Sequence, residues 1–168
     1  MDGLTSPAKE IVMDAHPQFA DTPFPVRTFL AGFDLAILSP LDADEDFAAI
    51  DESRPILDGL FGDNWPKGVT YESNLADLAR HEREFEARFA FSWTIRSSDE
   101  AYLGCAYFRP THGVTGVGRA AYWVREGPDR VDLLRAFGPA FRKWLGQFLP
   151  DEFEVKWFCN DWDVRRIS

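Results

Sequence analysis

The chain has 168 residues, of which 45% are hydrophobic, so it is long enough to form one globular domain with its own core. Its 28 Asp and Glu residues outnumber its 18 Lys and Arg residues, which gives a formal net charge of -10. This balance argues against a nucleic-acid partner, because binding to a phosphate backbone requires a basic face.

Residues 1–31 contain four prolines and show little hydrophobic periodicity. This pattern predicts an extended arm that packs over the domain or reaches a partner subunit, as in a homodimer, and leaves residues 32–168 as a single domain. The apolar run of the arm, Ile11 to Met13, is too short for a secretory core or a membrane span. We therefore expect a cytoplasmic protein with no membrane association, in which Cys105 and Cys159 are reduced and buried.

The first predicted elements are a strand and three helical pieces. Residues 33–38, FDLAIL, predict a strand that ends before Pro40, because a residue that precedes proline is disfavoured in helical geometry. Residues 44–61 predict two short helical pieces that meet near Pro55. Residues 70–90 then predict an amphipathic helix. Its apolar positions are Leu75, Leu78, Phe85 and Phe89.

A hairpin and a further strand follow this helix. Residues 89–110 hold two runs rich in aromatic and β-branched residues, joined by the polar turn at residues 97–100, which is typical of a hairpin. Residues 119–126, RAAYWVRE, predict the next strand. On the second hairpin strand, alternation places Cys105 and Tyr107 on the face opposite Ala106 and Phe108.

The last predicted elements are a helix and a strand. Asp129 opens a helix that runs to about residue 148, and Asp132 three positions later indicates a variant of the capping box. Residues 153–160, FEVKWFCN, predict a final strand that lies parallel to, and near, the strand before the helix. The order predicts a mixed α+β (α/β) fold, with a sheet that carries helices on both faces.

This order, with the segments HEREFEARFAFSWTI, YLGCAYFRP and AAYWVRE, resembles the GNAT-type N-acetyltransferase superfamily over roughly residues 33–162. The spacing of further residues is similar to that of a bacterial subgroup of small GNAT-like proteins. The resemblance implies a twisted, mostly antiparallel sheet and acetyl-CoA, or another acyl-CoA, as co-substrate. The residues that carry the subgroup pattern are Trp65, Pro66, Thr70, Asn74, His81, Phe85, Phe89, Gly104, Cys105, Trp123, Val124 and Arg125.

In that family the acyl-CoA lies between the fourth and fifth strands, with its pyrophosphate on backbone amides of the turn into the following helix, where the helix dipole favours an anion. The matching turn here is VREGPDRVD, which holds one glycine. The glycine-rich run GVTGVG lies before the strand instead, so we interpret it as a flexible turn. The resemblance therefore implies cofactor contacts at Trp123, Val124, Arg125, Gly127 and Arg130.

Acyl transfer to an amine requires a base. Glu126, at the end of the fourth strand, is the best-placed catalytic candidate, and its alternative interpretation is an ordinary solvated charge. His81 is a candidate substrate-pocket residue that could equally be a boundary residue of its helix. Tyr107 is a second such candidate, although aromatic residues of strands usually pack in the core.

Metal chemistry has no support in the sequence. The segment HEREF departs from the zinc motif HExxH at Phe85, where the second ligand should be, and no pair of CxxC motifs exists. We therefore expect no metal.

The leading hypothesis is an N-acyltransferase that moves an acetyl or related acyl group from CoA to a small-molecule amine or a basic peptide. The alternative hypothesis is a non-catalytic GNAT-like domain that binds a ligand or a partner protein. Release of free thiol from acetyl-CoA in the presence of an amine would distinguish the two.

Overall fold

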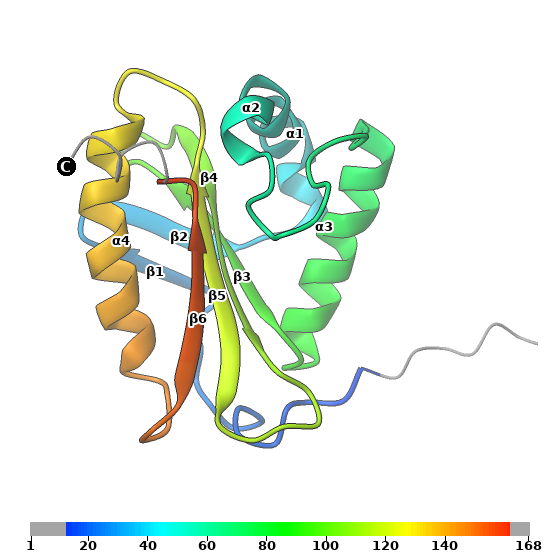
Figure 1. Cartoon of the computed structure of the whole chain (residues 1–168), viewed down its shortest axis with the longest axis vertical. Coiled ribbons are helices and arrows are strands. Elements are labelled where there is room, and N and C mark those ends of the chain that lie inside the picture. The colour runs from blue at the N-terminus through cyan, green and yellow to red at the C-terminus, as the bar shows by residue number, and fades with distance from the viewer. Residues whose placement is uncertain (1–12, 162–168) are drawn as a thin grey trace, which may run out of the picture.

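The structure, a computed structural model, describes residues 13–161. It is built from six strands and several helices in a mixed order along the chain (Figure 1). Their bounds are β1 Arg27–Leu30, β2 Phe33–Ile37, η1 Pro40–Asp42, α1 Ala43–Glu52, α2 Arg54–Leu57, α3 Tyr71–Glu86, β3 Phe91–Arg96, β4 Tyr102–Pro110, β5 Val117–Val124, α4 Arg130–Gly146 and β6 Glu154–Cys159.

The six strands form one sheet in which spatial order follows chain order from β1 to β6. All neighbours are antiparallel except β5 and β6, which are parallel because α4 crosses between them. Helix α4 covers one face of the sheet, and α1, α2 and α3 lie on the other (Figure 1). The predicted α+β class, the parallel pair and the helices on both faces are confirmed.

Strand β1 was missed by the sequence analysis, which placed the first strand at residue 33. Residues 27–30 pair with β2 through a tight turn in which Ala31 and Gly32 have φ values of 51° and 86°. Phe19 and Phe24 are buried, and the ring of Phe24 lies 4.3 Å from that of Phe91. The part of the arm from residue 13 onward therefore packs on the domain, whereas residues 1–12 lie outside the described residues.

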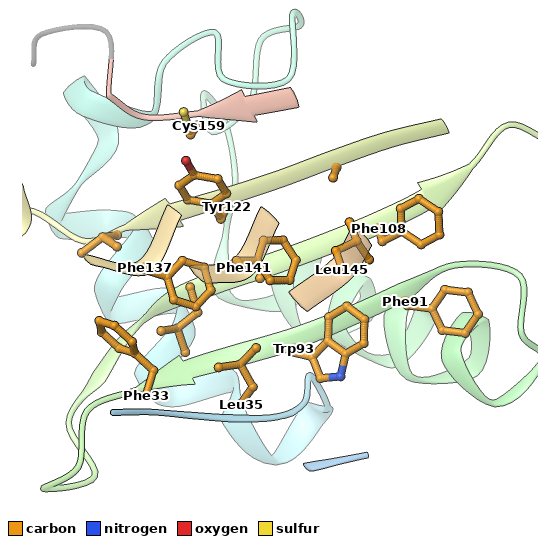
Figure 2. Packing of buried hydrophobic residues seen from close by; sticks show 14 of the residues in the cluster. Phe33, Leu35, Phe91, Trp93, Phe108, Tyr122, Phe137, Phe141, Leu145 and Cys159 are labelled. Carbon is orange, nitrogen blue, oxygen red and sulfur yellow. The ribbon is translucent and has the colours of Figure 1, made fainter. Parts of the chain in front are cut away.

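One core cluster fills the space between α4 and the sheet (Figure 2). The apolar face of α4 supplies Phe137 and Phe141, which are fully buried. Their rings lie 5.6 Å and 6.1 Å from the ring of Tyr122 on β5, and Phe141 also contacts Trp93 on β3. Edge-to-face contacts of this kind fix the helix against the strands.

A second core cluster lies between the other face and α1–α3. Leu57 and Leu78 from the helices pack there with Cys105 and Trp123 from the strands, all nearly inaccessible to solvent. Helix α3 is capped by Thr70, whose Oγ1 accepts from the amide of Ser73 in a capping box. The predicted amphipathic helix and the two short pieces α1 and α2 are confirmed.

A β-bulge in β4 decides which side chains face the second cluster. Ile95 pairs with Gly104 and Arg96 with Tyr102, so Leu103 is an extra residue on β4. The bulge turns Tyr102 and Cys105 to the same face, although they are three positions apart. Beyond it, the predicted alternation of Cys105 and Tyr107 against Ala106 and Phe108 is confirmed.

Gly104 is required by the same bulge. A Cβ added there would lie 1.9 Å from the carbonyl oxygen of Trp123 on β5, well inside van der Waals contact. Strands β4 and β5 therefore approach at this point more closely than a side chain would permit.

Candidate active site

A pocket of about 390 Å³ lies between the sheet and the helices α1 and α3. Helix α3 forms one wall, and the loop after α2 contributes the aromatic side chains of Phe61 and Trp65. The floor is formed by β4, β5 and β6, so the pocket extends to the parallel strand pair. The lining residues include Asp46, Asp77, His81, Tyr107, Arg109, Arg119, Ala121 and Phe158.

The two predicted substrate residues, His81 and Tyr107, both line this pocket, and their ring centroids lie 5.5 Å apart. His81 is held by carboxylates of its own helix, because residues three and four positions apart share a face. Its Nε2 lies 3.3 Å from Asp77 Oδ2, and its Nδ1 lies 3.8 Å from Glu84 Oε2.

Asp77 is the stronger of these two contacts and remains ionised. Burial by itself would raise the pKa of Asp77, but hydrogen bonds and charges from His81 and Arg80 outweigh it and lower the pKa to about 2. The carboxylate beside His81 fixes the orientation of the ring. The pair has the geometry of a base and the group that orients it.

Tyr107 lines the pocket, and its hydroxyl group is buried beside Trp123 and Cys105. Its oxygen accepts a hydrogen bond from Trp123 Nε1 at 3.0 Å. Burial raises the pKa of Tyr107 well above its usual value, so the hydroxyl keeps its proton and can donate it to a ligand. Trp123, a predicted cofactor contact, is fully buried behind Tyr107 and supports it from below.

A buried polar cluster under the pocket was not predicted. Asp46 accepts hydrogen bonds from Asn74 Nδ2 at 2.8 Å, from the hydroxyl of Tyr102 and from Cys105 Sγ at 3.3 Å. Burial, followed by the charge of Asp46, raises the pKa of the Cys105 thiol well above its usual value. Cys105 is therefore a neutral thiol, and both cysteines are free and buried, as predicted.

The turn between β5 and α4, predicted to hold the pyrophosphate, uses several of its own amides. Arg125 N donates to Leu103 O at 2.7 Å, and Glu126 N donates to Ser53 Oγ at 2.8 Å. Gly127 N donates to the carboxylate of Glu126 at 3.1 Å. Fewer amides of the turn are thus available to an anion than in a glycine-rich loop.

The start of α4 also differs from the prediction. Asp129 is its N-cap residue but makes no side-chain capping hydrogen bond, so the predicted capping-box variant is wrong. The physical reason is the backbone of Asp129, whose φ of -96° and ψ of 0° is not the extended geometry of a capping residue.

Glu126, the predicted catalytic residue, is exposed and is not among the residues that line the pocket. Its neighbour Arg125 forms an ion pair with Glu52 and donates to the carbonyl of Tyr102, which ties the turn to α1 and β4. The structure therefore brings His81 and Tyr107 together but does not bring Glu126 to them.

The side chain of Asn160 continues the pairing of β5 and β6 beyond their last paired residues. The strands are paired up to Tyr122 and Cys159. Beyond this pair the side-chain amide of Asn160 bonds both backbone groups of Val124, and Arg130 Nη1 donates to Asn160 O at 2.8 Å. Val124 and Arg130, both predicted cofactor contacts, are thus engaged within the protein.

Residues 13–161 contain neither a candidate metal site nor a candidate membrane span. No group of three or more His, Cys, Asp or Glu side chains in this part of the chain could hold a metal ion. Within the same range, no helix is long and apolar enough to cross a membrane.

Comparison with known proteins identifies the fold. No protein-family model and no curated protein matches the sequence. Among solved structures, a candidate ribosomal-protein-serine acetyltransferase from Vibrio cholerae is similar with a TM-score of 0.62 at 12% identity, covering 86% of this chain and 78% of that one. The ribosomal-protein-S5-alanine acetyltransferase from Vibrio fischeri gives 0.55 at 15% identity, with 73% and 68% covered.

A third similar structure is the microcin C7 self-immunity acetyltransferase MccE, in complex with acetyl-CoA and AMP. Its TM-score is 0.52 at 12% identity, and the match covers 69% of this chain and 63% of that one. At such identities the likeness concerns the fold.

Proposed function

Because the chain has the fold of the GNAT acetyltransferases, we propose that it transfers an acetyl or related acyl group from coenzyme A to an amine. The observation that carries the proposal is the pocket of His81 and Tyr107. Its floor includes Ala121 of β5 and Phe158 of β6, which belong to the strand pair where the family resemblance places the acyl donor. The pocket and the family resemblance both support this location for the proposed reaction.

His81 is the proposed base. An amine has to lose a proton as it attacks a thioester, and a neutral imidazole within reach can accept it. Asp77, ionised beside His81, stabilises the imidazolium that forms. His81 takes this role in place of Glu126, which lies outside the pocket.

Tyr107 is the proposed hydrogen-bond donor of the reaction. Its hydroxyl accepts from Trp123 Nε1, keeps its proton, and would donate it to a ligand oxygen or sulfur after turning away from Cys105. Trp123 therefore fixes the position of this hydroxyl.

Coenzyme A, when bound, supplies the acyl thioester. We propose the β5–α4 turn as its place, with contacts at Val124, Arg125, Gly127 and Arg130, and with Trp123 behind them. The helix N-terminus of α4 and the two arginines favour an anion there. This placement requires the side chain of Asn160 to move away from Val124.

The test combines binding and turnover. Purified protein is titrated by calorimetry with acetyl-CoA, with CoA and ATP as controls, and is then incubated with acetyl-CoA and a panel of amines while free thiol is measured. We expect acetyl-CoA to bind and thiol release to depend on the amine. Absence of acetyl-CoA binding up to about millimolar concentration, or about -4 kcal/mol, would contradict the proposal. Binding without amine-dependent thiol release would instead favour a non-catalytic binding domain.

A further inference from the structure

A row of three cationic residues crosses the sheet beside the pocket. Arg109 on β4 lies opposite Arg119 on β5, which in turn lies opposite Lys156 on β6. The adjacent row on the same face consists of Tyr107, Ala121 and Phe158, all of which line the pocket. Because side chains two positions apart on a strand share a face, the cationic row also faces α3.

Like charges directly opposite each other destabilise a sheet, and this chain is strongly acidic overall. Arg109 is compensated: its Nη2 lies 2.7 Å from Oε2 of Glu84, a buried carboxylate that also binds Arg80. No such ion pair is formed by Arg119 or Lys156 within residues 13–161. Among the described residues, the sheet therefore presents two adjacent positive charges without an ion-pair partner.

The position of these charges points to the pocket. Arg119 lines it directly, and Lys156 Nζ lies 5.3 Å from the ring centroid of Phe158, another lining residue. The cationic row is two residues along the strands from the row of Tyr107, about 7 Å at the usual rise per residue. A ligand with its amine at His81 could thus place a second group within reach of both cations.

We propose that the pocket takes an acceptor that carries an anionic group, a carboxylate or a phosphate, in addition to its amine, and that Arg119 and Lys156 bind this group. The assignment as an acceptor rests on the proposed acyltransferase function, whereas the binding of the anion does not. Arginine suits this role because its guanidinium can form two parallel hydrogen bonds to such a group. The proposal replaces the expectation of a basic peptide with an acceptor that carries a negative group beside its amine.

Binding is measured by calorimetry on the whole chain without coenzyme A. The probes are straight-chain aminocarboxylates with two to five methylene groups, the alkylamines of equal length that lack the carboxylate, and the corresponding aminoalkyl phosphates. We expect at least one anionic probe to bind more tightly than its matched alkylamine. The relative affinities of carboxylates and phosphates show which anion the site prefers.

The variants are Arg119→Gln and Lys156→Gln, singly and combined, and the matched controls are Arg135→Gln and Lys143→Gln. Both control residues are exposed on α4, which covers the opposite face of the sheet. Replacing them removes the same number of positive charges without altering the cationic row. We expect the double variant to bind the anionic probe about tenfold or more weakly, with the controls unchanged. The proposal would be overturned if wild type and double variant bound the anionic probe equally. It would also be overturned if wild type bound alkylamines as tightly as the matched anionic probes, or bound no probe at all.

Failure of this proposal is distinguishable from failure of the proposed function. If simple alkylamines release thiol from acetyl-CoA as fast as aminocarboxylates do, the proposed acyltransferase function stands and the anion site is rejected. Anion binding that depends on Arg119 without any thiol release would retain the site and reject the transfer reaction.

Discussion

The side-chain amide of Asn160 takes the place of a strand residue beside Val124. Asn160 Oδ1 accepts from Val124 N at 3.1 Å, and Asn160 Nδ2 donates to Val124 O at 2.8 Å. Both residues are buried. The parallel pairing of β5 and β6 is thereby extended past its last backbone hydrogen bonds, at the place where the proposed acyl donor has to enter.

Replacing Asn160 should therefore lower the stability of the fold and raise its affinity for acetyl-CoA. Asn160→Ala leaves two buried backbone groups of Val124 without partners, so we expect the free energy of unfolding to fall by about 1–3 kcal/mol. The same change removes the side chain that continues the pairing of β5 and β6, so the affinity for acetyl-CoA should rise by up to about tenfold. Urea denaturation and calorimetry measure the two effects, and Asn64→Ala, at an exposed asparagine, is the control. An unchanged or weaker affinity would show that Asn160 does not obstruct the donor.

Replacing His81 tests the proposed base. His81→Gln keeps a polar side chain but cannot take a proton, so we expect kcat to fall by about 10²–10⁴-fold with acetyl-CoA and an amine. Asp77→Asn should lower kcat less, because Asp77 acts through the orientation and charge of His81. His112→Gln is the matched control, since His112 Nε2 bonds the carbonyl of Phe89 outside the pocket. Full activity of His81→Gln would exclude it as the base.

The low pKa of Asp77 predicts how the free energy of unfolding depends on pH. Its pKa is lowered to about 2 in the folded chain from a reference value of 3.8, so the unfolded state binds more protons between these values. The contribution of Asp77 is therefore complete above about pH 4 and is lost as the pH falls through about 2. Its side chain is 41% exposed, so solvent screening reduces the size of the effect.

Urea denaturation from pH 2 to 6 measures this dependence. The decline of stability at low pH should be shallower in Asp77→Asn than in wild type, whereas Asp58→Asn, at an exposed aspartate, should follow wild type. Identical pH profiles for Asp77→Asn and wild type would show that the low pKa of Asp77 does not contribute to folding.

The two cysteines should be unreactive in the folded protein. Cys105 is inaccessible, and burial together with the charge of Asp46 keeps its thiol neutral. Cys159 is also buried. Titration with a chromogenic disulfide reagent at pH 8 should detect no rapidly reacting thiol before denaturation and both thiols afterwards. Rapid reaction of a native thiol would mean that the strands open locally.

Asp46 should be the most sensitive position of the polar cluster. Asp46→Ala leaves the buried donors of Asn74 and Tyr102 without their acceptor, each at a cost of about 1–3 kcal/mol. We expect a loss of about 3 kcal/mol in urea denaturation. Asp44→Ala, which removes an exposed contact with Tyr71, should cost less than about 1 kcal/mol.

The sequence predicted most of the sheet and helices because their apolar residues form recognisable local patterns. Helices α3 and α4 repeat these residues at the helical period, and the five strands β2 to β6 are apolar runs bounded by turn residues or proline. Strand β1 was missed because it has only four residues, which alternate between exposed and partly buried just twice. Its pairing with β2 also depends on the turn at Ala31 and Gly32. The prolines that precede this segment, Pro23 and Pro25 among them, made it resemble a loop.

The site was only partly predictable. His81 and Tyr107 were found as polar or aromatic residues on elements that face one another. Asp46 was missed because it is one of several acidic residues in DADEDFAAIDE, and only tertiary packing buries it. The role of Asn160 was missed because its partner, Val124, lies 36 positions away in the sequence. Such contacts leave no local periodicity.

The clash at Gly104 has a consequence for finding distant relatives. Any side chain there would meet the carbonyl oxygen of Trp123, so a chain that builds the same bulge has to keep glycine at this position. The bulge also directs Cys105 and Tyr102 toward Asp46. A glycine in the second hairpin strand, followed directly by a small residue and preceded two positions earlier by tyrosine, is therefore a structural marker that would survive after overall sequence similarity has been lost.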